Sequence, residues 1–344
     1  MPQSERDTTT DSVSITVIIV AYNSGDFLQP CIDALAAQSF TDFEAVVIDN
    51  ASTDGAVDAL SLPDKRFRID RPGANLGFAG ANNRAARASS APFIALLNPD
   101  TRVAPDWLEH LMAGASRWPD CPAFGSTQLR LDEPDILDGA GDSWFAGGVA
   151  WRALEGRPAR DNPPEGETFA PCGAAAFYDR ARFVELGGFD ERFFCYCEDV
   201  DYGYRVRLSG QVCIQIKDAV VYHAGSGTTG RASEFTLFHG HRNRIWVFFK
   251  NTPTVLLPVL TPIHLAINLY LYLRANRERR AYLRRAYSAA WAGLGAVMKQ
   301  RKALARHRTG SLRALIRAMI WSPLLVSRRG AKLDRAGRRI VSRS

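Results

Sequence analysis

The sequence predicts an α/β fold, in which helices cover both faces of a mostly parallel sheet, followed by a basic helical C-terminal region. Two observations predict this organisation. Continuous apolar runs alternate with helical stretches through about the first hundred residues, and strands of that kind are buried on both faces of a parallel sheet. Residues 231–344 then hold 24 Lys and Arg against three acidic residues, whereas residues 1–230 hold 19 basic and 33 acidic residues.

The first half of the chain is expected to form four buried strands with helices between them. The runs that predict strands are 14–20, 44–48, 67–69 and 93–97, and the helical stretches are 27–37, 54–60 and 77–89. In such sheets, ligands bind outside the carboxyl ends of the strands. Asp49 and Asp100 follow two of these strands, so we expect both carboxylates to line one crevice.

The second half is predicted to continue the sheet after a long excursion. Helices are expected at 105–117, 179–186 and 198–208, ordered chain at 169–178, strands at 212–216 and 219–222, and a loop or hairpin excursion at 132–167. The helix at 198–208 carries acids at its start and arginines at its end, which suits the helix dipole. Asp201 and Arg205 stand four residues apart in it and can therefore pair.

The C-terminal region combines an apolar segment with many arginines. Residues 252–273 are nearly long enough to cross a bilayer, which takes about 20 residues. Pro253, Pro258 and Pro262 interrupt the segment, which favours an in-plane or re-entrant membrane contact over a simple span or an ordinary soluble subdomain. The basic residues around it suit either an anionic membrane surface or a nucleic acid.

Cysteine use and the N-terminus indicate the compartment. The six cysteines contain no CxxC pair and no zinc-type spacing, so small buried thiols are expected. Residues 1–12 are polar and acidic and are not typical of a signal peptide. Reduced thiols and a cytoplasmic location follow as the expectation.

Carboxylates at strand ends are the first candidates for chemistry. Asp100, in Asn98-Pro99-Asp100, could hold a divalent cation that bridges a diphosphate, because Mg²⁺ and Mn²⁺ prefer oxygen ligands. The alternative is a turn-capping aspartate. Asp49 could accept the imide N–H of a pyrimidine base, or it could form an Asx turn.

Three acids open the helix at 198–208. Glu198, Asp199 and Asp201 repel one another unless an ion, a ligand or the helix N-terminus offsets their charge. A carboxylate kept ionised there can accept a proton from a hydroxyl nucleophile. The alternative is a solvated helix N-terminus.

His223 follows a predicted strand and precedes a glycine loop. A neutral imidazole at a strand end can complete a metal site, although a lone histidine is commonly structural. Residues 225–230 spell GxGxxG, but no βαβ unit precedes them and no acid follows at the right distance. A dinucleotide site, and with it an NAD-dependent oxidoreductase, is therefore rejected.

Taken in order, these pieces resemble the family 2 glycosyltransferases of the GT-A fold, a Rossmann-like sheet flanked by helices. Within them the chain is similar to the bacterial rhamnosyltransferase-like branch, which extends lipid-linked or cell-wall glycans. The matching segments run through 17–23, 47–54, 75–82, 97–101, 187–194, 198–201, His223 with its glycine loop, and 241–244. They cover roughly 70% of the chain, from about residue 13 to 250.

The resemblance implies a role for each matched residue. Asp199 would be the catalytic base, supported by Glu198, and Asp100 with His223 would hold Mg²⁺ or Mn²⁺. Nucleotide-sugar contacts are expected from Ala21, Tyr22, Asn23, Asp49, Asn82, Asn98 and Asp100, and acceptor contacts from Asp201, Arg242 and Asn243. Asn98 stands where the family's Asp-x-Asp has its first acid, which leaves the cation site with less negative charge; Asn-Pro-Asp is common in the rhamnosyltransferase-like branch.

The activity expected from the resemblance is a single inverting displacement. A sugar, L-rhamnose from dTDP-L-rhamnose, would move to a lipid-linked or cell-surface glycan acceptor. Donors such as a UDP-hexose, UDP-galactofuranose or GDP-mannose stay open as alternatives. A nucleic-acid-binding protein that uses the basic tail is a distant alternative, because the acidic front half and the absence of a known nucleic-acid motif disfavour it.

The expected domain organisation follows from the same segments. Residues 1–12 would be disordered, and 13–235 would form the transferase domain, with a nucleotide-sugar half at 13–103 and an acceptor half at 104–235. Residues 236–344 would be helical and membrane-associating, holding the enzyme peripherally on the inner face of the plasma membrane.

Overall fold

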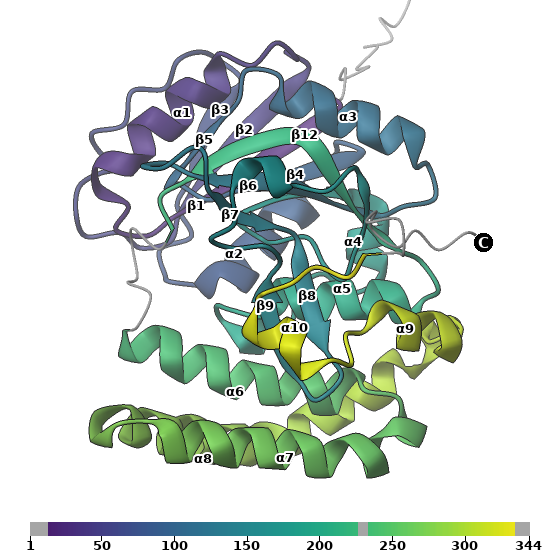
Figure 1. Ribbon diagram of the computed structural model, residues 1–344. Helices are drawn as coiled ribbons and strands as arrows, with labels where there is room; N and C mark the ends of the chain where they lie inside the picture. The colour runs from purple at the N-terminus through teal and green to yellow at the C-terminus, as the bar shows by residue number, and fades with distance from the viewer. Residues whose placement is uncertain (1–12, 226–232, 334–344) are drawn as a thin grey trace, which may run out of the picture.

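The computed structural model describes residues 13–225 and 233–333 (Figure 1). The expected disorder of residues 1–12 and the glycine loop beyond Gly225 lie outside these described residues.

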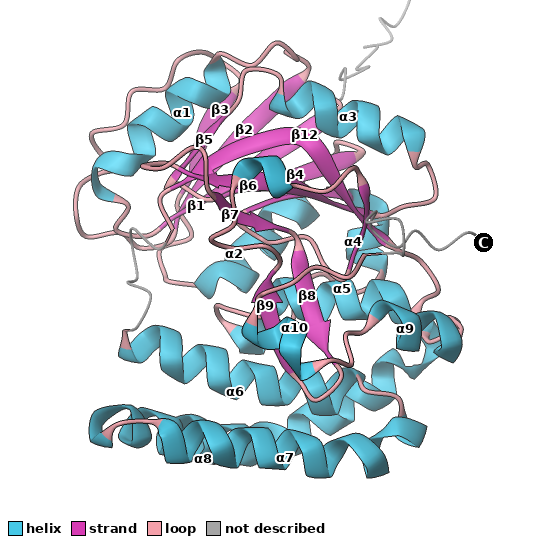
Figure 2. Ribbon diagram, viewed as in Figure 1, coloured by secondary structure: helices cyan, strands magenta, loops and turns pink. Residues whose placement is uncertain are grey.

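Helices lie around a central group of strands, as Figure 2 shows. The strands are β1 (Ile15–Ala21), β2 (Phe43–Asp49), β3 (Phe67–Asp70), β4 (Phe93–Leu97), β5 (Thr101–Val103), β6 (Ala123–Arg130), β7 (Leu137–Ala140), β8 (Asp142–Phe145), β9 (Val149–Arg152), β10 (Gly166–Thr168), β11 (Ala175–Asp179) and β12 (Cys213–His223). The α-helices are α1 (Leu28–Ala36), α2 (Gly77–Ala88), α3 (Trp107–Arg117), α4 (Arg180–Glu185), α5 (Glu198–Leu208), α6 (Glu234–Asn251), α7 (Leu257–Arg274), α8 (Arg277–Ala303), α9 (Leu312–Ala318) and α10 (Pro323–Ser327).

One mixed sheet dominates the molecule. Its main path within the described residues runs β10-β12-β6-β11-β4-β1-β2-β3, with β5 paired to β12 and β7 to β6. The strands β4, β1, β2 and β3 are parallel, and β11 lies antiparallel between β4 and β6. The α/β class with a parallel-dominated sheet is therefore confirmed.

Two predicted elements differ from the structure. Residues 54–60 form turns and not the predicted helix, because Gly55 adopts φ +76° and the carboxylate of Asp54 accepts hydrogen bonds from the backbone N–H groups of Gly25 and Ala56 at 2.8 and 3.1 Å. The strands predicted at 212–216 and 219–222 are one strand, β12, whose pairing with β6 shifts register between Ile216 and Val220.

The excursion predicted at 132–167 contains a hairpin and two further strands. β8 and β9 form a separate two-stranded sheet, while β7 pairs with β6 and β10 with β12. The excursion therefore returns to the main sheet at two places, and it carries the β8–β9 hairpin toward the C-terminal helices (Figure 1).

Apolar side chains fill both faces of the sheet, as a sheet covered on two sides requires. One cluster joins the strands to α1 and α3 and includes Ile19, Leu35 and Trp107. A second packs the opposite face against α2, α4 and α5 and includes Ala85, Phe183 and Tyr202. A third cluster joins the β8–β9 hairpin and α5 to the C-terminal helices.

The C-terminal helices form a layer below the sheet (Figure 1). α6 packs along α8, and the indole N–H of Trp246 donates to the carbonyl of Ala290 at 2.9 Å. Arg301 of α8 donates to the carbonyls of Lys250 and Thr252 at 3.2 and 2.6 Å.

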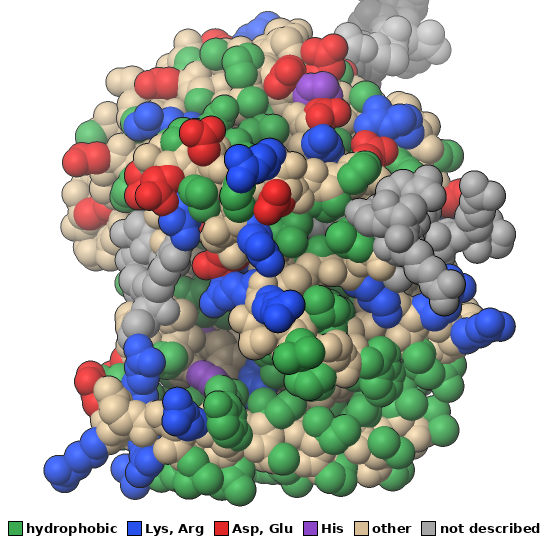
Figure 3. Space-filling model, in the orientation of Figure 1, with side chains coloured by type: hydrophobic (Ala, Val, Ile, Leu, Met, Phe, Trp, Pro, Cys, Tyr) green, Lys and Arg blue, Asp and Glu red, His purple; other side chains and the backbone are tan. Residues whose placement is uncertain are grey.

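One segment of the described chain, Thr254–Arg274, is long and apolar enough to cross a membrane, with a mean hydropathy of 1.6. Only 17% of its most apolar window is buried. Its apolar side chains therefore face outward on the lower part of the molecule, where Figure 3 shows hydrophobic side chains gathered over α7 and α8.

Candidate active site

The carboxyl ends of β1 and β2 lie side by side, because Ala21 and Asp49 are register partners. The carboxylate of Asp49 is 8% exposed at residue level and accepts from the backbone N–H of Ser52 at 2.9 Å and from Arg71 at 2.8 Å. The bond to Ser52 reaches the backbone N–H three residues on, whereas the Asx turn considered from the sequence would reach only two residues on. A pyrimidine base that donates to Asp49 would therefore share this carboxylate with Arg71.

The other predicted nucleotide contacts cluster near this edge. Tyr22 is 45% exposed, and Asn23 adopts φ +49° with its side-chain oxygen accepting from the backbone N–H of Thr53 at 2.8 Å. Asn82 is buried on α2 and donates to the carbonyl of Phe78. Its side-chain oxygen has no hydrogen-bond partner in the described part of the chain.

Asp100 and His223 meet because β12 pairs with the chain that follows β4, with His223 in register with Thr101. The Nε2 atom of His223 lies 3.4 Å from Oδ1 of Asp100, and both side chains are buried. On its other side, Nδ1 of His223 lies 2.7 Å from a carboxylate oxygen of Asp138. Asp138 in turn contacts Arg152.

This row of side chains fits a hard divalent cation. An imidazole nitrogen and a carboxylate oxygen face each other at the separation that neighbouring ligands of one ion have. Asp138 can accept a hydrogen bond from Nδ1–H of His223, which directs Nε2 toward Asp100. Partners of metal-binding histidines commonly have this role. Burial works against protonation of His223, but the hydrogen bonds with Asp100 and Asp138 raise its pKa above the usual value.

A hollow of about 600 Å³ opens beside these residues and is called the central hollow below. The part of the chain before α6, called the sheet domain below, contributes Asn98, Asp142, Arg152, Gly173, Glu198 and Asp199 to its lining. The C-terminal helices contribute Gly240, His241, Arg244 and Leu271. Figure 3 shows the surface hollowed between the sheet domain and these helices.

Asp199 is held firmly at the wall of the central hollow. Its two carboxylate oxygens accept from the backbone N–H groups of Gly173 at 2.8 Å and Val200 at 2.7 Å. Ala174, which follows Gly173, accepts from the backbone N–H of Asn98 at 2.9 Å. The segment that binds Asp199 is therefore hydrogen-bonded to the Asn-Pro-Asp turn that carries Asp100.

Burial dominates the electrostatics of the hollow. It raises the pKa of Asp199, although the hydrogen bonds from Gly173 and Val200 counter part of the effect. Burial also holds the pKa of Glu198 and of Asp142 well above the usual range, with the nearby charge of Asp199 as a second cause. Three carboxyl groups with raised pKa values in one hollow are typical of a site that moves protons.

A second group of potential cation ligands lies within the hollow itself. Single ligand atoms of Asp142, Cys172 and Asp199 all lie within 4.8 Å of one another. Burial raises the pKa of the Cys172 thiol to about 12, so it stays protonated near neutral pH and is a poor ligand for a hard ion. Asp100 with His223 fits the cation better.

The loop before α5 is strained and is held from outside. Phe194, Tyr196 and Cys197 all adopt positive φ angles, +65°, +72° and +66°, a conformation that costs about 1–3 kcal/mol per non-glycine residue. The side-chain amide of Asn243 donates to three carbonyls of this loop, those of Phe193, Cys195 and Tyr196. Asn243 thereby positions Glu198 and Asp199.

Arg242 and Asn243, predicted to bind the acceptor, are thus occupied in holding this loop. Arg242 donates to the carbonyls of Arg192 and Phe193 at 3.2 and 2.9 Å. Asn243 is fully buried. Both contact the site through backbone carbonyls of this loop.

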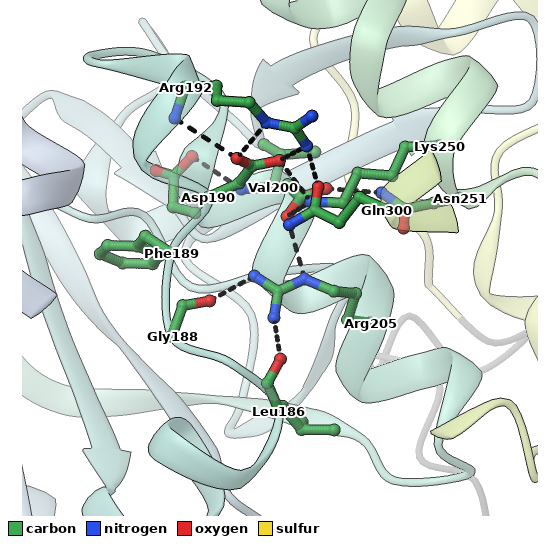
Figure 4. A network of polar contacts seen from close by, with 12 residues as sticks. Leu186, Gly188, Phe189, Asp190, Arg192, Val200, Arg205, Lys250, Asn251 and Gln300 are labelled. Carbon is green, nitrogen blue, oxygen red and sulfur yellow. Dashed lines mark hydrogen bonds and ion pairs between the residues drawn. The ribbon is translucent and has the colours of Figure 1, made fainter. Parts of the chain in front are cut away.

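Asp201 also lies apart from the central hollow. It is fully buried and binds Lys250 at 2.8 Å, Arg205 at 2.9 Å and Asn251 at 2.7 Å. Figure 4 shows these three partners together. The predicted pairing of Asp201 with Arg205 is confirmed. The role in acceptor binding is not retained, because this carboxylate joins α5 to α6.

Sequence reasoning missed three side chains of the site. Asp138, Asp142 and Arg152 lie on β7, β8 and β9, within the excursion where only loops or hairpins were expected. Their sole signal in the sequence was the presence of acids and an arginine in a glycine-rich stretch. Strand pairing that no local pattern announced brings them to His223 and Asp199.

Comparisons with known proteins agree with this geometry. Residues 16–186 match the model of the family described as Glycosyl transferase family 2. The chain is 29% identical to an N-acetylglucosaminyl-diphospho-decaprenol L-rhamnosyltransferase of Mycobacterium tuberculosis, over 65% of this chain and 81% of that protein. It is 30% identical to the O-antigen biosynthesis protein RfbC of Myxococcus xanthus, over 61% of this chain and 17% of that protein.

Solved structures are similar in fold. The mannosyltransferase PcManGT from Pyrobaculum calidifontis, in complex with GDP-Man and Mn²⁺, gives a TM-score of 0.50 at 20% identity and covers 90% of this chain and 88% of that chain. TarS 1–349 of S. aureus, in complex with UDP, gives 0.52 at 15% identity and covers 89% and 90%. These likenesses support the GT-A architecture.

Proposed function

The chain belongs to glycosyl transferase family 2, and from this premise we propose that it transfers L-rhamnose from dTDP-L-rhamnose to a lipid-linked glycan acceptor. The sugar and the acceptor are suggested by the N-acetylglucosaminyl-diphospho-decaprenol L-rhamnosyltransferase to which the chain is similar. The observation that carries the proposal is the buried carboxylate of Asp199, fixed by two backbone N–H groups at the wall of the central hollow.

The reaction proposed is one inverting displacement. The acceptor hydroxyl enters the central hollow and gives its proton to the carboxylate of Asp199, whose raised pKa suits a base. The hydroxyl oxygen bonds to the anomeric carbon as the bond from that carbon to the nucleoside diphosphate breaks. Glu198, whose pKa lies well above the usual range, supports the site next to the base.

The donor is proposed to lie along the carboxyl ends of the parallel strands. Ala21, Tyr22, Asn23 and Asp49 would border the nucleotide, and Asn82 and Asn98 the sugar diphosphate. Asp100 and His223 would hold a divalent cation, which when bound supplies Lewis-acid stabilisation of the leaving diphosphate. The 3.4 Å approach of their ligand atoms supports this assignment.

The domain organisation is part of the proposal. We assign residues 13–235 to the transferase domain, with donor binding in 13–103 and acceptor binding in 104–235. Residues from 236 on would hold the enzyme at the inner face of the plasma membrane, facing the cytoplasm. The outward apolar side chains of α7, among them Val259, Leu269 and Leu273, support that placement.

The test is a transfer assay with a matched pair of variants. Wild type is given dTDP-L-rhamnose, a UDP-hexose, UDP-galactofuranose or GDP-mannose, with a lipid-linked GlcNAc acceptor, with and without chelator. Asp199→Asn should lose about 100-fold or more in transfer rate because the base is gone, while its donor affinity stays. Asp120→Asn, a change at an exposed acid of the sheet domain, should transfer like wild type.

Each result has a distinct meaning. Full activity of Asp199→Asn would remove Asp199 from the role of base. Preference for a UDP- or GDP-sugar would replace the rhamnosyl donor but keep the transferase. Transfer that survives chelation unchanged would contradict the cation at Asp100 and His223.

A further inference from the structure

A second hollow, called the helix groove below, lies between α6, α7 and α8. Its volume is about 380 Å³, and its lining is dominated by apolar and aromatic side chains, among them Phe249, Leu265, Leu269, Tyr272, Tyr287 and Trp291. Leu269 and Trp291 are 58% and 52% exposed. A groove of this composition, open to the surface, suits a hydrocarbon chain because burial of apolar area stabilises binding.

The helix groove adjoins the central hollow across α6. His241 and Arg244 line the central hollow, whereas Ile245 and Phe249, on the next turns of the same helix, line the groove. Asn268 of the groove accepts a hydrogen bond from Arg244 at 2.6 Å. One elongated ligand lying across α6 could thus occupy both hollows.

Arg244 supplies positive charge at the junction. Its side chain is buried, and the acceptors that it contacts are the carbonyl of Gly148, the amide oxygen of Asn268 and the ring of His241. In the described part of the chain no carboxylate forms an ion pair with it, and burial lowers its pKa. A buried cation that faces a hollow without a counter-ion is a site for an anion.

We propose that the helix groove binds the isoprenyl chain of the acceptor lipid and that Arg244 binds its diphosphate, which directs the attached sugar toward Asp199. This inference rests on the proposed function, since it concerns the acceptor of the same reaction. The order of chemistry along the two hollows matches the order within such a lipid: apolar chain, diphosphate, then sugar next to the base. The outward apolar face of α7 lets the chain enter the groove from the lipid phase.

Two leucines of α7 provide a matched pair of variants. Leu269 lines the groove and Leu273, one turn further along, does not, although both are 58% exposed. Leu269→Gln and Leu273→Gln therefore make the same chemical change at the same exposure. Neither lies in the core, so both proteins should fold.

The test measures binding of farnesyl diphosphate to the full chain in detergent solution by calorimetry, without donor. Leu269→Gln should raise the Kd at least fivefold, and Leu273→Gln should leave it within twofold of wild type. Farnesol should bind more weakly than farnesyl diphosphate, and Arg244→Gln, checked for an unchanged Tm, should abolish this difference. Dioctanoyl phosphatidylglycerol should not compete at equal concentration.

Three results would overturn the inference. The first is that wild type does not bind farnesyl diphosphate, and the second is that the two leucine variants change the Kd equally. The third is that the phosphatidylglycerol competes equally, which would make the groove a site for bilayer lipid. The proposed function fails separately, if no donor supports transfer.

Discussion

Single residues at the site combine opposing effects, and Asp199 shows this best. Burial raises its pKa, and two backbone N–H groups stabilise the ionised form. The result is a carboxylate that is more basic than an exposed aspartate and whose ionised form is stabilised by fixed backbone donors. That combination suits a proton acceptor, because basicity and the ionised state are both needed.

The pH dependence of transfer should report this group. Only ionised Asp199 accepts the proton, so kcat/KM should fall as the pH is lowered through its pKa. Because the pKa is raised above the usual 3.8, the fall should begin at a higher pH than an exposed aspartate would give. The residual rate of Asp199→Asn should lack this acidic limb; an identical limb in the variant would assign it to another group.

Asp138 offers a second prediction at the residue scale. Asp138→Asn keeps the shape of the side chain but weakens the acceptor for Nδ1 of His223. Loss of such a partner typically lowers metal affinity by about 10- to 100-fold, so Mn²⁺ binding measured by electron paramagnetic resonance should weaken by that factor. Asp135→Asn, an exposed neighbour, should bind Mn²⁺ like wild type. Equal affinities would show that Asp138 does not orient the histidine.

Among the elements, α5 and α6 are joined by buried charges as well as by apolar packing. Lys250 of α6 is fully buried between Asp190 and Asp201, at 2.9 and 2.8 Å (Figure 4). Burial works to raise the pKa of Asp190, but Arg192 and Lys250 hold it below the usual range. The same helix carries Asn243, which holds the strained loop before α5.

Replacement of Lys250 should therefore lower the free energy of unfolding substantially. Lys250→Met leaves two buried carboxylates with less compensation, and breaking a pair of this kind destabilises by about 3–5 kcal/mol. Urea unfolding should show a loss of that size. Lys299→Met, at an exposed position of α8, should change the free energy of unfolding by about 0.5 kcal/mol or less. A small effect at Lys250 would mean that the neighbouring arginines suffice.

Across the whole molecule the charge is unevenly distributed, because residues 1–230 are net acidic and residues 231–344 are net basic. The turn between α7 and α8 concentrates exposed arginines next to the outward apolar face of α7. Simple truncation near residue 250 would test membrane binding poorly, because α8 packs along α6 and Arg301 binds the end of α6. Substitution of exposed charges leaves that packing intact.

Membrane binding should depend on this cluster. The triple change of Arg274, Arg277 and Arg279 to Gln removes three exposed charges, each worth about 1 kcal/mol at an anionic surface. Partition onto vesicles containing phosphatidylglycerol should weaken by roughly 100-fold. The same change at Arg102, Arg157 and Arg160, exposed on the sheet domain, is the control. Equal losses from both triples would indicate a non-specific charge effect.

The local sequence determined the helices and buried strands of the first half, because each apolar period is set within a few residues. It also determined the Asn-Pro-Asp turn and the acids that open α5. The predicted helix at 54–60 failed because Gly55 and the capping carboxylate of Asp54 stabilise turns there.

Only the tertiary structure decided which acids serve the site. In the sequence, Asp201 could not be distinguished in role from Glu198 and Asp199. In the structure, the side chain of Asp201 points away from the central hollow and binds Lys250, whereas Asp199 lines the hollow. Asp138 and Asp142 carried no local pattern and reach the site through β7 and β8. Burial and pairing partners set the chemistry of a carboxylate, and partners distant in the chain are brought together only when the sheet and the helical layer assemble.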